Sequence, residues 1–223
     1  MIRSRRAFIR EALAIAATAS ASGLSSGTVA WSQTTLSSEA ALQQLIDGNR
    51  RFAEDRMTSF AEDLELLKAK TAERQEPFAA VLSCADSRVP VELIFDQSIG
   101  HVFVTRVAGN IATSAMIASL EYGAAVLGTR VIMVLGHANC GAVKASIEAT
   151  AAPGQISGLY PYIRPAVDQA GDNLDAAVRA NARIQASLLR QSSPVLAEAI
   201  KKKQLKIVAA FYDLATGRVS LLD

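Results

Sequence analysis

The stretch Arg130-Val131-Ile132-Met133-Val134-Leu135-Gly136-His137 contains the most apolar run of the chain beyond residues 1–30. A short, continuous run of branched aliphatic residues that ends at a glycine is typical of a strand buried on both faces of a sheet. Similar apolar runs occur at Phe78–Ser83 and at Val102–Val107. The sequence therefore predicts three buried strands, and the third spans Arg130–Leu135, directly before Gly136-His137.

Segments whose apolar residues recur at helical spacing separate and follow these strands. The sequence predicts helices at residues 38–52, 61–73 and 113–127, from about 140, at 174–189 and at 194–201. Residues 153–165 are interrupted by glycines and prolines, so we expect an irregular connection there.

Two further strands are predicted at Lys206–Tyr212 and Arg218–Leu222, with a turn at Thr216-Gly217 between them. Such a short connection favours a hairpin, so the last strand should be antiparallel and lie at an edge. Strands that alternate with helices indicate an α/β fold with a mainly parallel central β-sheet flanked by helices. About 190 residues are enough for one such core, and we expect one domain over residues 36–223.

The first 30 residues have the pattern of an export signal rather than of a folded segment. Ser4–Arg10 contains two adjacent arginines, and the weakly apolar stretch Ala12–Ala21 that follows is too short to span a membrane stably. Thr28–Ala30 offers small residues at which a signal peptidase could cut. A frayed amphipathic helix is the alternative. We expect a twin-arginine signal, recognised by the twin-arginine export machinery, and a folded product in the periplasm or outside the cell.

The predicted signal accounts for the positive net charge of the chain. The whole chain has a formal charge of +2, whereas residues 1–30, with four arginines and one glutamate, carry +3, which leaves −1 for the rest. A nearly neutral protein has no long-range field to attract nucleic acid or anionic lipid. We therefore expect no nucleic-acid partner and no stable membrane insertion.

Two motifs that lie far apart, Ser83–Arg88 and Gly136–Gly141, contain both cysteines of the chain and one of its two histidines. Each follows a predicted strand, and in open α/β sheets ligands bind at the carboxyl ends of strands. Two thiolates and one imidazole suit zinc, and three protein ligands leave a fourth position open to water, as in catalytic sites. The sequence therefore predicts a catalytic zinc site of Cys84, His137 and Cys140.

A disulfide is the alternative for Cys84 and Cys140, because two cysteines in an exported protein ordinarily suggest one. A disulfide, however, has no need of His137 two residues before Cys140. Export in the folded state also lets the chain take up its metal in the reducing cytoplasm first. Zinc is therefore the favoured interpretation.

Asp86 and Arg88 place a carboxylate and a guanidinium beside this site. Paired with Arg88, Asp86 would accept a hydrogen bond from zinc hydroxide and orient its lone pair toward the substrate. Released from Arg88, it could fill the fourth zinc position and close the site, and a surface ion pair of little value is the alternative. Zinc lowers the pKa of bound water from about 15.7 to about 7. Two thiolates weaken this effect, so activity should rise toward alkaline pH.

These motifs resemble those of the β-class carbonic anhydrases, which reversibly hydrate carbon dioxide to bicarbonate and a proton. The resemblance extends from about Leu36 to the C-terminus. The segments that carry it are Cys84–Pro90, Phe95–Gln97, Arg106–Asn110 and His137–Gly141. It implies a lyase, a carbonate dehydratase, in which zinc-bound hydroxide attacks carbon dioxide.

The resemblance implies one zinc ion per chain, held by Cys84, His137 and Cys140, with Asp86 and Arg88 as the catalytic dyad. In the open form water or hydroxide would be the fourth ligand. In the closed form Asp86 would take its place.

The resemblance also implies a small substrate pocket. Its expected members are Gly141, which offers its backbone N–H, and the side chains of Gln75, Phe103 and Tyr122. Gln75 and Tyr122 would act across a dimer interface, and the alternatives are a solvated loop for Gln75 and helix packing for Tyr122. The N-terminal helices would embrace a neighbouring subunit, so a homodimer or a dimer of dimers is expected.

Two other functions stay open at this point. Carbonyl sulfide and carbon disulfide are small, linear and apolar like carbon dioxide, and relatives on this scaffold hydrolyse them. A non-catalytic zinc-binding protein, locked in the closed form, is the alternative of another class, although a zinc store needs neither the Asp86–Arg88 pair nor a glycine-lined pocket. An export signal would shift the role of an anhydrase toward supplying or trapping inorganic carbon across an envelope.

Overall fold

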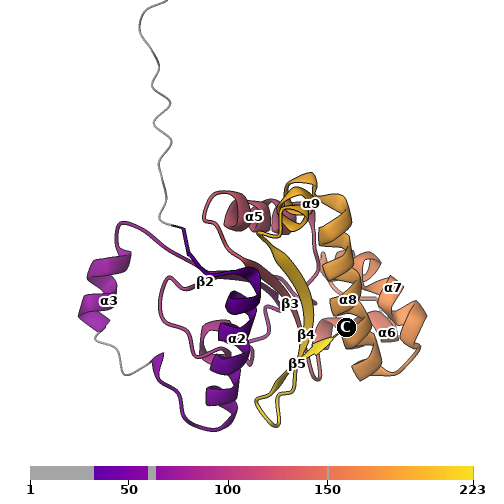
Figure 1. Cartoon of the computed structure of the whole chain (residues 1–223). Coiled ribbons are helices and arrows are strands. Elements are labelled where there is room, and N and C mark those ends of the chain that lie inside the picture. The colour runs from indigo at the N-terminus through magenta and orange to yellow at the C-terminus, as the bar shows by residue number, and fades with distance from the viewer. Residues whose placement is uncertain (1–32, 60–63, 150, 223) are drawn as a thin grey trace, which may run out of the picture. The chain divides into compact units, whose positions relative to one another are not determined.

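A five-stranded sheet forms the centre of the computed structural model (Figure 1). Its strands are β1 (Ala79–Ser83), β2 (Val102–Arg106), β3 (Val131–His137), β4 (Lys206–Tyr212) and β5 (Val219–Leu222). The strand order is β2-β1-β3-β4-β5; the first four of these are parallel, and β5 runs antiparallel to β4 at the edge. The predicted α/β fold, with its antiparallel edge strand, is confirmed.

The structure describes residues 33–59, 64–149 and 151–222. The chain divides into two units, Met1–Ala30 and Trp31–Asp223, and the predicted export signal lies outside the described residues. Within the described ranges, no helix is both long enough and apolar enough to cross a membrane.

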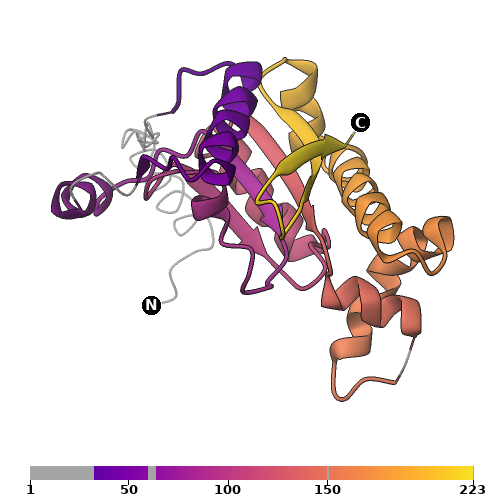
Figure 2. The same cartoon turned by 90° about the horizontal axis from the view of Figure 1, so that it is seen from below.

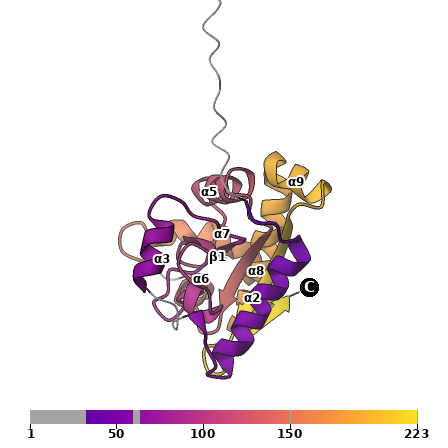
Figure 3. The same cartoon turned by 60° about the vertical axis from the view of Figure 1, so that its left-hand side comes forward.

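Helices cover the sheet on both faces. The helices of the described residues are α2 (Ser38–Ala53), α3 (Leu64–Thr71), α4 (Val91–Ile94), α5 (Ser114–Ala125), α6 (Gly141–Glu148), the 3₁₀ turn η2 (Ile156–Leu159), α7 (Tyr160–Ala170), α8 (Leu174–Ser192) and α9 (Pro194–Lys201). Figure 2 shows α2 on one side of the sheet and α8 on the other, Figure 3 shows α2 in front of the sheet, and Figure 1 shows α3 set apart from both layers. This is the two-sided cover that parallel strands require.

The expected irregular connection over residues 153–165 is wrong in its second half, because α7 begins at Tyr160 and contains Pro165. Pro161 lies in the first turn, where an amide N–H has no partner within the helix. Pro165 removes one helical hydrogen bond. Ile163 and Val167 are nevertheless buried in the core that α7 shares with α6 and α8. Burial of this apolar face outweighs the local preference of proline. The prediction also ended the third strand two residues early, because β3 includes His137.

Alternate residues of the central strands divide between two cores. Val81 and Met133 face a core shared with α2 and α4, whereas Leu82 and Val134 face a core shared with α5, α8 and α9. All five residues of β1 and all seven of β3 are buried. Burial on both faces explains why these strands have continuous apolar sequences rather than alternating ones.

Helix α2 lies unusually close to the end of α4. A methyl group added at Gly48 would lie 1.8 Å from the Phe95 carbonyl oxygen. Asn49, one residue along, donates from Nδ2 to the carbonyls of Ile94 (3.2 Å) and Gly217 (2.9 Å), and its Oδ1 accepts from the Val219 N–H (2.8 Å). One buried amide therefore ties α2 to α4 and to the C-terminal hairpin.

Asp96 fastens the loop after α2 to the same region. Its carboxylate accepts hydrogen bonds from the N–H groups of Thr58 (3.0 Å) and Ser59 (2.8 Å), from the Thr58 hydroxyl (3.0 Å) and from Arg51 Nε (2.5 Å). Burial alone would raise the pKa of Asp96, but the Ser59 N–H, the Arg51 guanidinium and Thr58 together hold it well below its usual range. The buried carboxylate is therefore ionised and fully engaged.

We expect Gly48→Ala to lower the free energy of unfolding by about 1–3 kcal/mol, because the added methyl group meets a backbone carbonyl that cannot move alone. Elsewhere in a helix the same change stabilises by roughly 0.5–1 kcal/mol. Urea unfolding measures the difference. Gly158→Ala, where a methyl group meets nothing within 4 Å, is the control; equal stabilities of the two variants would contradict the close packing of α2.

Asp96 should also contribute to the acid sensitivity of the fold. Since its folded pKa lies below the unfolded value of about 3.9, its contribution to stability is complete at neutral pH and is lost as the pH falls below about 5. Asp96→Asn should lower the free energy of unfolding at pH 7 and flatten its decline in acid. Urea unfolding over a pH series tests this, with Asp47→Asn in an exposed ion pair as the control; an unchanged slope for Asp96→Asn would refute it.

Candidate metal centre

Two neighbouring parallel strands bring the predicted ligands together at their carboxyl ends. β1 ends at Ser83, so Cys84 follows it directly, and His137 is the last residue of β3. β1 and β3 pair in register, with Ser83 opposite Leu135. Cys140 caps the N-terminus of α6 after a short turn. Three ligands from two motifs therefore meet because the strands run side by side in the same direction.

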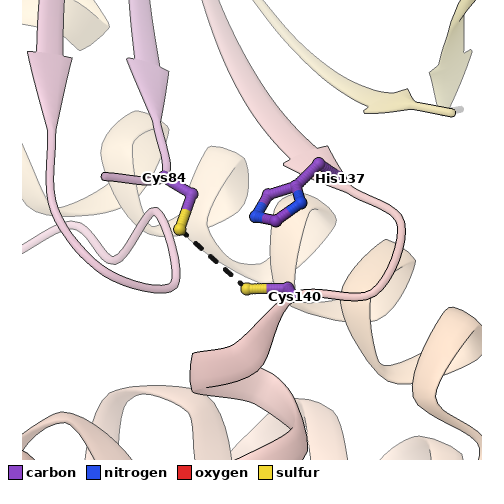
Figure 4. A group of neighbouring side chains, drawn as sticks. All are labelled: Cys84, His137 and Cys140. Carbon is purple, nitrogen blue, oxygen red and sulfur yellow. Dashed lines mark hydrogen bonds between the residues drawn. The ribbon is translucent and has the colours of Figure 1, made fainter. Parts of the chain in front are cut away.

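The three side chains point toward one another (Figure 4). The ligand atoms of Cys84, His137 and Cys140 all lie within 4.8 Å of one another, and all three residues are buried. The two sulfur atoms are 4.0 Å apart. A disulfide requires about 2.05 Å, and both cysteines are free in this structure. The arrangement is a convergent donor set with room for an ion.

The imidazole of His137 is oriented for metal binding. Its Nδ1 lies 2.9 Å from the Ala138 carbonyl oxygen, and this carbonyl can only accept, so Nδ1 carries the proton. Nε2 is then a lone-pair donor, and it is buried with no hydrogen-bond partner among the residues that the structure describes. A buried polar atom without a partner is costly. A metal ion is the partner that this atom lacks.

The two thiols differ in their electrostatics. A hydrogen bond from Cys140 lowers the pKa of Cys84 to about 4 despite burial, and the Gly109 N–H, 3.3 Å from the Cys84 sulfur, lowers it further. The same contact with Cys84, together with burial, raises the pKa of Cys140. One proton is thus shared between two sulfur atoms, and a divalent cation that displaces it would satisfy both. The donor set fits one zinc ion.

Asp86 and Arg88 form a tightly bonded pair beside the donor set. Asp86 Oδ1 accepts from the Arg88 N–H (2.9 Å) and Nε (2.9 Å), and Oδ2 accepts from Nη2 (2.7 Å). These bonds from Arg88 hold the pKa of Asp86 well below its usual range. Asp86 Oδ2 is 3.9 Å from His137 Nε2. An ionised carboxylate therefore stands beside the donor atoms and is fixed by Arg88.

Arg106 reinforces this region from the neighbouring strand. Its Nε donates to the Cys84 carbonyl (2.9 Å) and its Nη2 to the Asp86 carbonyl (2.5 Å). Sequence reasoning noted the segment Arg106–Asn110 but assigned it no role. The position of Arg106 at the end of β2, the second neighbour of β1, was the signal that could have found this role.

The expected pocket residues are distributed over two regions. Gly141 is the first residue of α6, next to Cys140, and is exposed. Phe103 on β2 and Tyr122 on α5 contact each other, with ring centroids 6.2 Å apart. Phe103 packs with the core under α5, α8 and α9, whereas both cysteines belong to the core under α6, α7 and α8. Gln75 is exposed in the segment after α3. Roles for these residues in substrate binding stay predictions.

Comparison with known proteins agrees with this geometry. A family model described as carbonic anhydrase matches residues 79–219. Carbonic anhydrase 2 of Mycobacterium tuberculosis is 34% identical over 192 residues, which cover 82% of this chain and 92% of that relative. The carbonic anhydrase of Pseudomonas aeruginosa is 34% identical over 199 residues, which cover 82% of this chain and 88% of that relative.

A solved structure has the same fold. The Coccomyxa β-carbonic anhydrase in complex with acetazolamide aligns with a TM-score of 0.65 at 29% identity, over 81% of this chain and 86% of that one. With a convergent Cys-His-Cys donor set at the edge of a matching sheet, the chain belongs to the β-class carbonic anhydrase family.

Proposed function

We propose that this protein catalyses the reversible hydration of carbon dioxide to bicarbonate and a proton, with one zinc ion per chain. One observation carries the proposal: Cys84, His137 and Cys140 converge beside a carboxylate that Arg88 holds in place. The donor set explains how a metal is held. The adjacent Asp86–Arg88 pair supplies an ionised hydrogen-bond acceptor in a fixed orientation, which a protein that only stores zinc would not need.

The ion, when bound, supplies a positive charge that lowers the pKa of water to about 7 and makes hydroxide available near neutral pH. Asp86 is ionised, so its side chain can only accept hydrogen bonds. We propose that it accepts one from the attacking water or hydroxide and orients the oxygen lone pair toward carbon dioxide. Arg88 donates hydrogen bonds to both carboxylate oxygens, and this pairing would hold Asp86 back from binding the ion itself.

Gly141 is suited to receive the substrate. As the first residue of α6, its N–H has no acceptor within the helix and can donate to a substrate oxygen. A methyl group added at this glycine would meet nothing within 4 Å, so there is open space next to Cys140. We propose that carbon dioxide enters this space.

The remaining pocket residues fit a role between subunits. Tyr122 is 42% exposed although it is a large aromatic residue, and it lies against Phe103. Leu64 on α3 is 53% exposed, and α3 lies apart from the sheet layers (Figure 1). We propose a homodimer, or a dimer of dimers, in which Gln75 and Tyr122 act across the interface between subunits and Phe103 lines the small apolar pocket.

We expect Asp86→Asn to lower carbon dioxide hydration by about 10–100-fold while zinc stays bound, because the amide no longer fixes the nucleophile as an ionised acceptor does. Stopped-flow hydration with a pH indicator, on zinc-quantified protein from neutral to alkaline pH, measures this. Wild-type turnover should rise with pH and disappear when a chelator removes the zinc. Asp168→Asn, in an exposed ion pair with Arg164, is the control.

Unchanged turnover of Asp86→Asn would reject the role of the carboxylate. Full zinc occupancy without hydration by the wild type at any pH would reject the anhydrase. Hydrogen sulfide release from carbonyl sulfide would then separate a hydrolase of sulfur analogues from a non-catalytic zinc protein.

We also propose that residues 1–30 direct export of the folded protein by the twin-arginine route, because Arg5-Arg6 precede Phe8 and a mild apolar stretch. Such a location would suit an enzyme that supplies or traps inorganic carbon across an envelope.

Replacing Arg5 and Arg6 together by lysine should keep the full-length chain in the cytoplasm, since the positive charge remains but the arginine pair does not. Cell fractionation with mass measurement of the mature N-terminus tests this. The matched control replaces Arg3 and Arg10 by lysine, which leaves the pair intact and should permit export. Equal export of both double variants would refute the twin-arginine assignment.

A further inference from the structure

Two amide side chains are buried on the face of α8 that lies against the loop following β2. Asn181 and Gln185 are each 1% exposed and lie one helical turn apart. Long polar side chains are seldom buried so completely unless their hydrogen bonds are satisfied within the protein. The partners of these two amides therefore indicate what they are for.

The amides bond to each other and to the loop. Asn181 Nδ2 donates to the Gly109 carbonyl (2.8 Å), and Asn181 Oδ1 accepts from Gln185 Nε2 (3.1 Å). Gln185 Oε1 accepts from the Ala112 N–H (2.9 Å), and its Nε2 also donates to the Tyr162 carbonyl (3.0 Å). The loop between β2 and α5 is thus held at two points, at Gly109 and at Ala112.

The loop is shaped to aim one N–H at the metal centre. A turn is closed by the Asn110 N–H on the Val107 carbonyl (2.9 Å), and Gly109 has φ +78°. A methyl group at Gly109 would lie 2.7 Å from Ile163 Cδ1, so the position is restricted in both conformation and space. In this conformation the Gly109 N–H points at the Cys84 sulfur, 3.3 Å away.

We propose that Asn181 and Gln185 are positioning residues of the zinc centre, which act through the Gly109 N–H on the Cys84 thiolate. An N–H···S bond withdraws charge from the sulfur and fixes the direction of its lone pair. Partners of metal ligands tune both affinity and electronics in this way. The inference rests on the proposed zinc site, and it adds two residues that lie on a helix contributing no ligand.

A purely structural role is the competing explanation, because the same bonds fasten α8 to the loop. Asn181→Leu removes the donor while keeping a similar volume, and leaves the Gly109 carbonyl without its partner. Gln185→Met removes the acceptor of the Ala112 N–H at a similar volume. It serves as the second variant should the first not fold. Leu189→Ala, one turn further along α8 in a core that holds no ligand, is the matched control for lost stability.

Two measurements on the purified full chain decide between these roles. Competition with a chromophoric chelator gives zinc affinity, and cobalt substitution gives the thiolate-to-metal charge-transfer band. We expect Asn181→Leu and Gln185→Met to lower zinc affinity by about 10–100-fold. The charge-transfer band should also move to lower energy, because the sulfur that loses its hydrogen bond is more electron-rich. Leu189→Ala should leave both readouts unchanged.

An unchanged band in both amide variants would overturn the proposal whatever happens to stability, and so would an equal shift in Leu189→Ala. Absence of stoichiometric zinc and cobalt binding by the wild type would instead reject the zinc site itself. A wild type that binds both metals, with amide variants that behave like it, would reject the positioning role alone.

Discussion

The parallel pairing of β1 with β3 is the constraint on which the rest of the structure depends. Because both strands run in the same direction and in register, their carboxyl ends reach the same edge, and Cys84 comes to lie beside His137. A parallel pair needs cover on both faces, which α2 and α4 provide on one side and α5, α8 and α9 on the other. The helical layers are therefore a condition for the metal centre.

Electrostatics make this edge suited to one kind of occupant. Two thiols and an imidazole are buried together, and His137 Nε2 has no partner among the described groups. A divalent cation satisfies all three donors at once. Asp86 has the opposite requirement, since Arg88 engages both of its oxygens and keeps it ionised without a metal. The site thus combines donors that need an ion with a carboxylate that does not.

Support for the site comes from elements that contribute no ligand. Arg106, at the end of β2, holds the backbone of Cys84 and Asp86, and Asn181 on α8 holds the turn that presents the Gly109 N–H. Each of these groups is polar and is matched to specific hydrogen-bond partners within the protein.

Sequence alone determined the strands, most of the helices and the three donors, because periodicity reflects the burial of each residue and the donors follow strand ends. It did not predict α7 across Pro165, where burial of Ile163 outweighs proline's local preference. Nor did it assign roles to Arg106 or Asn181. Their hydrogen-bond partners, Cys84 and Gly109, lie far from them along the chain, and no local sequence pattern indicates such contacts. Which polar groups meet was decided by tertiary structure, through strand pairing and the approach of α8 to the loop after β2.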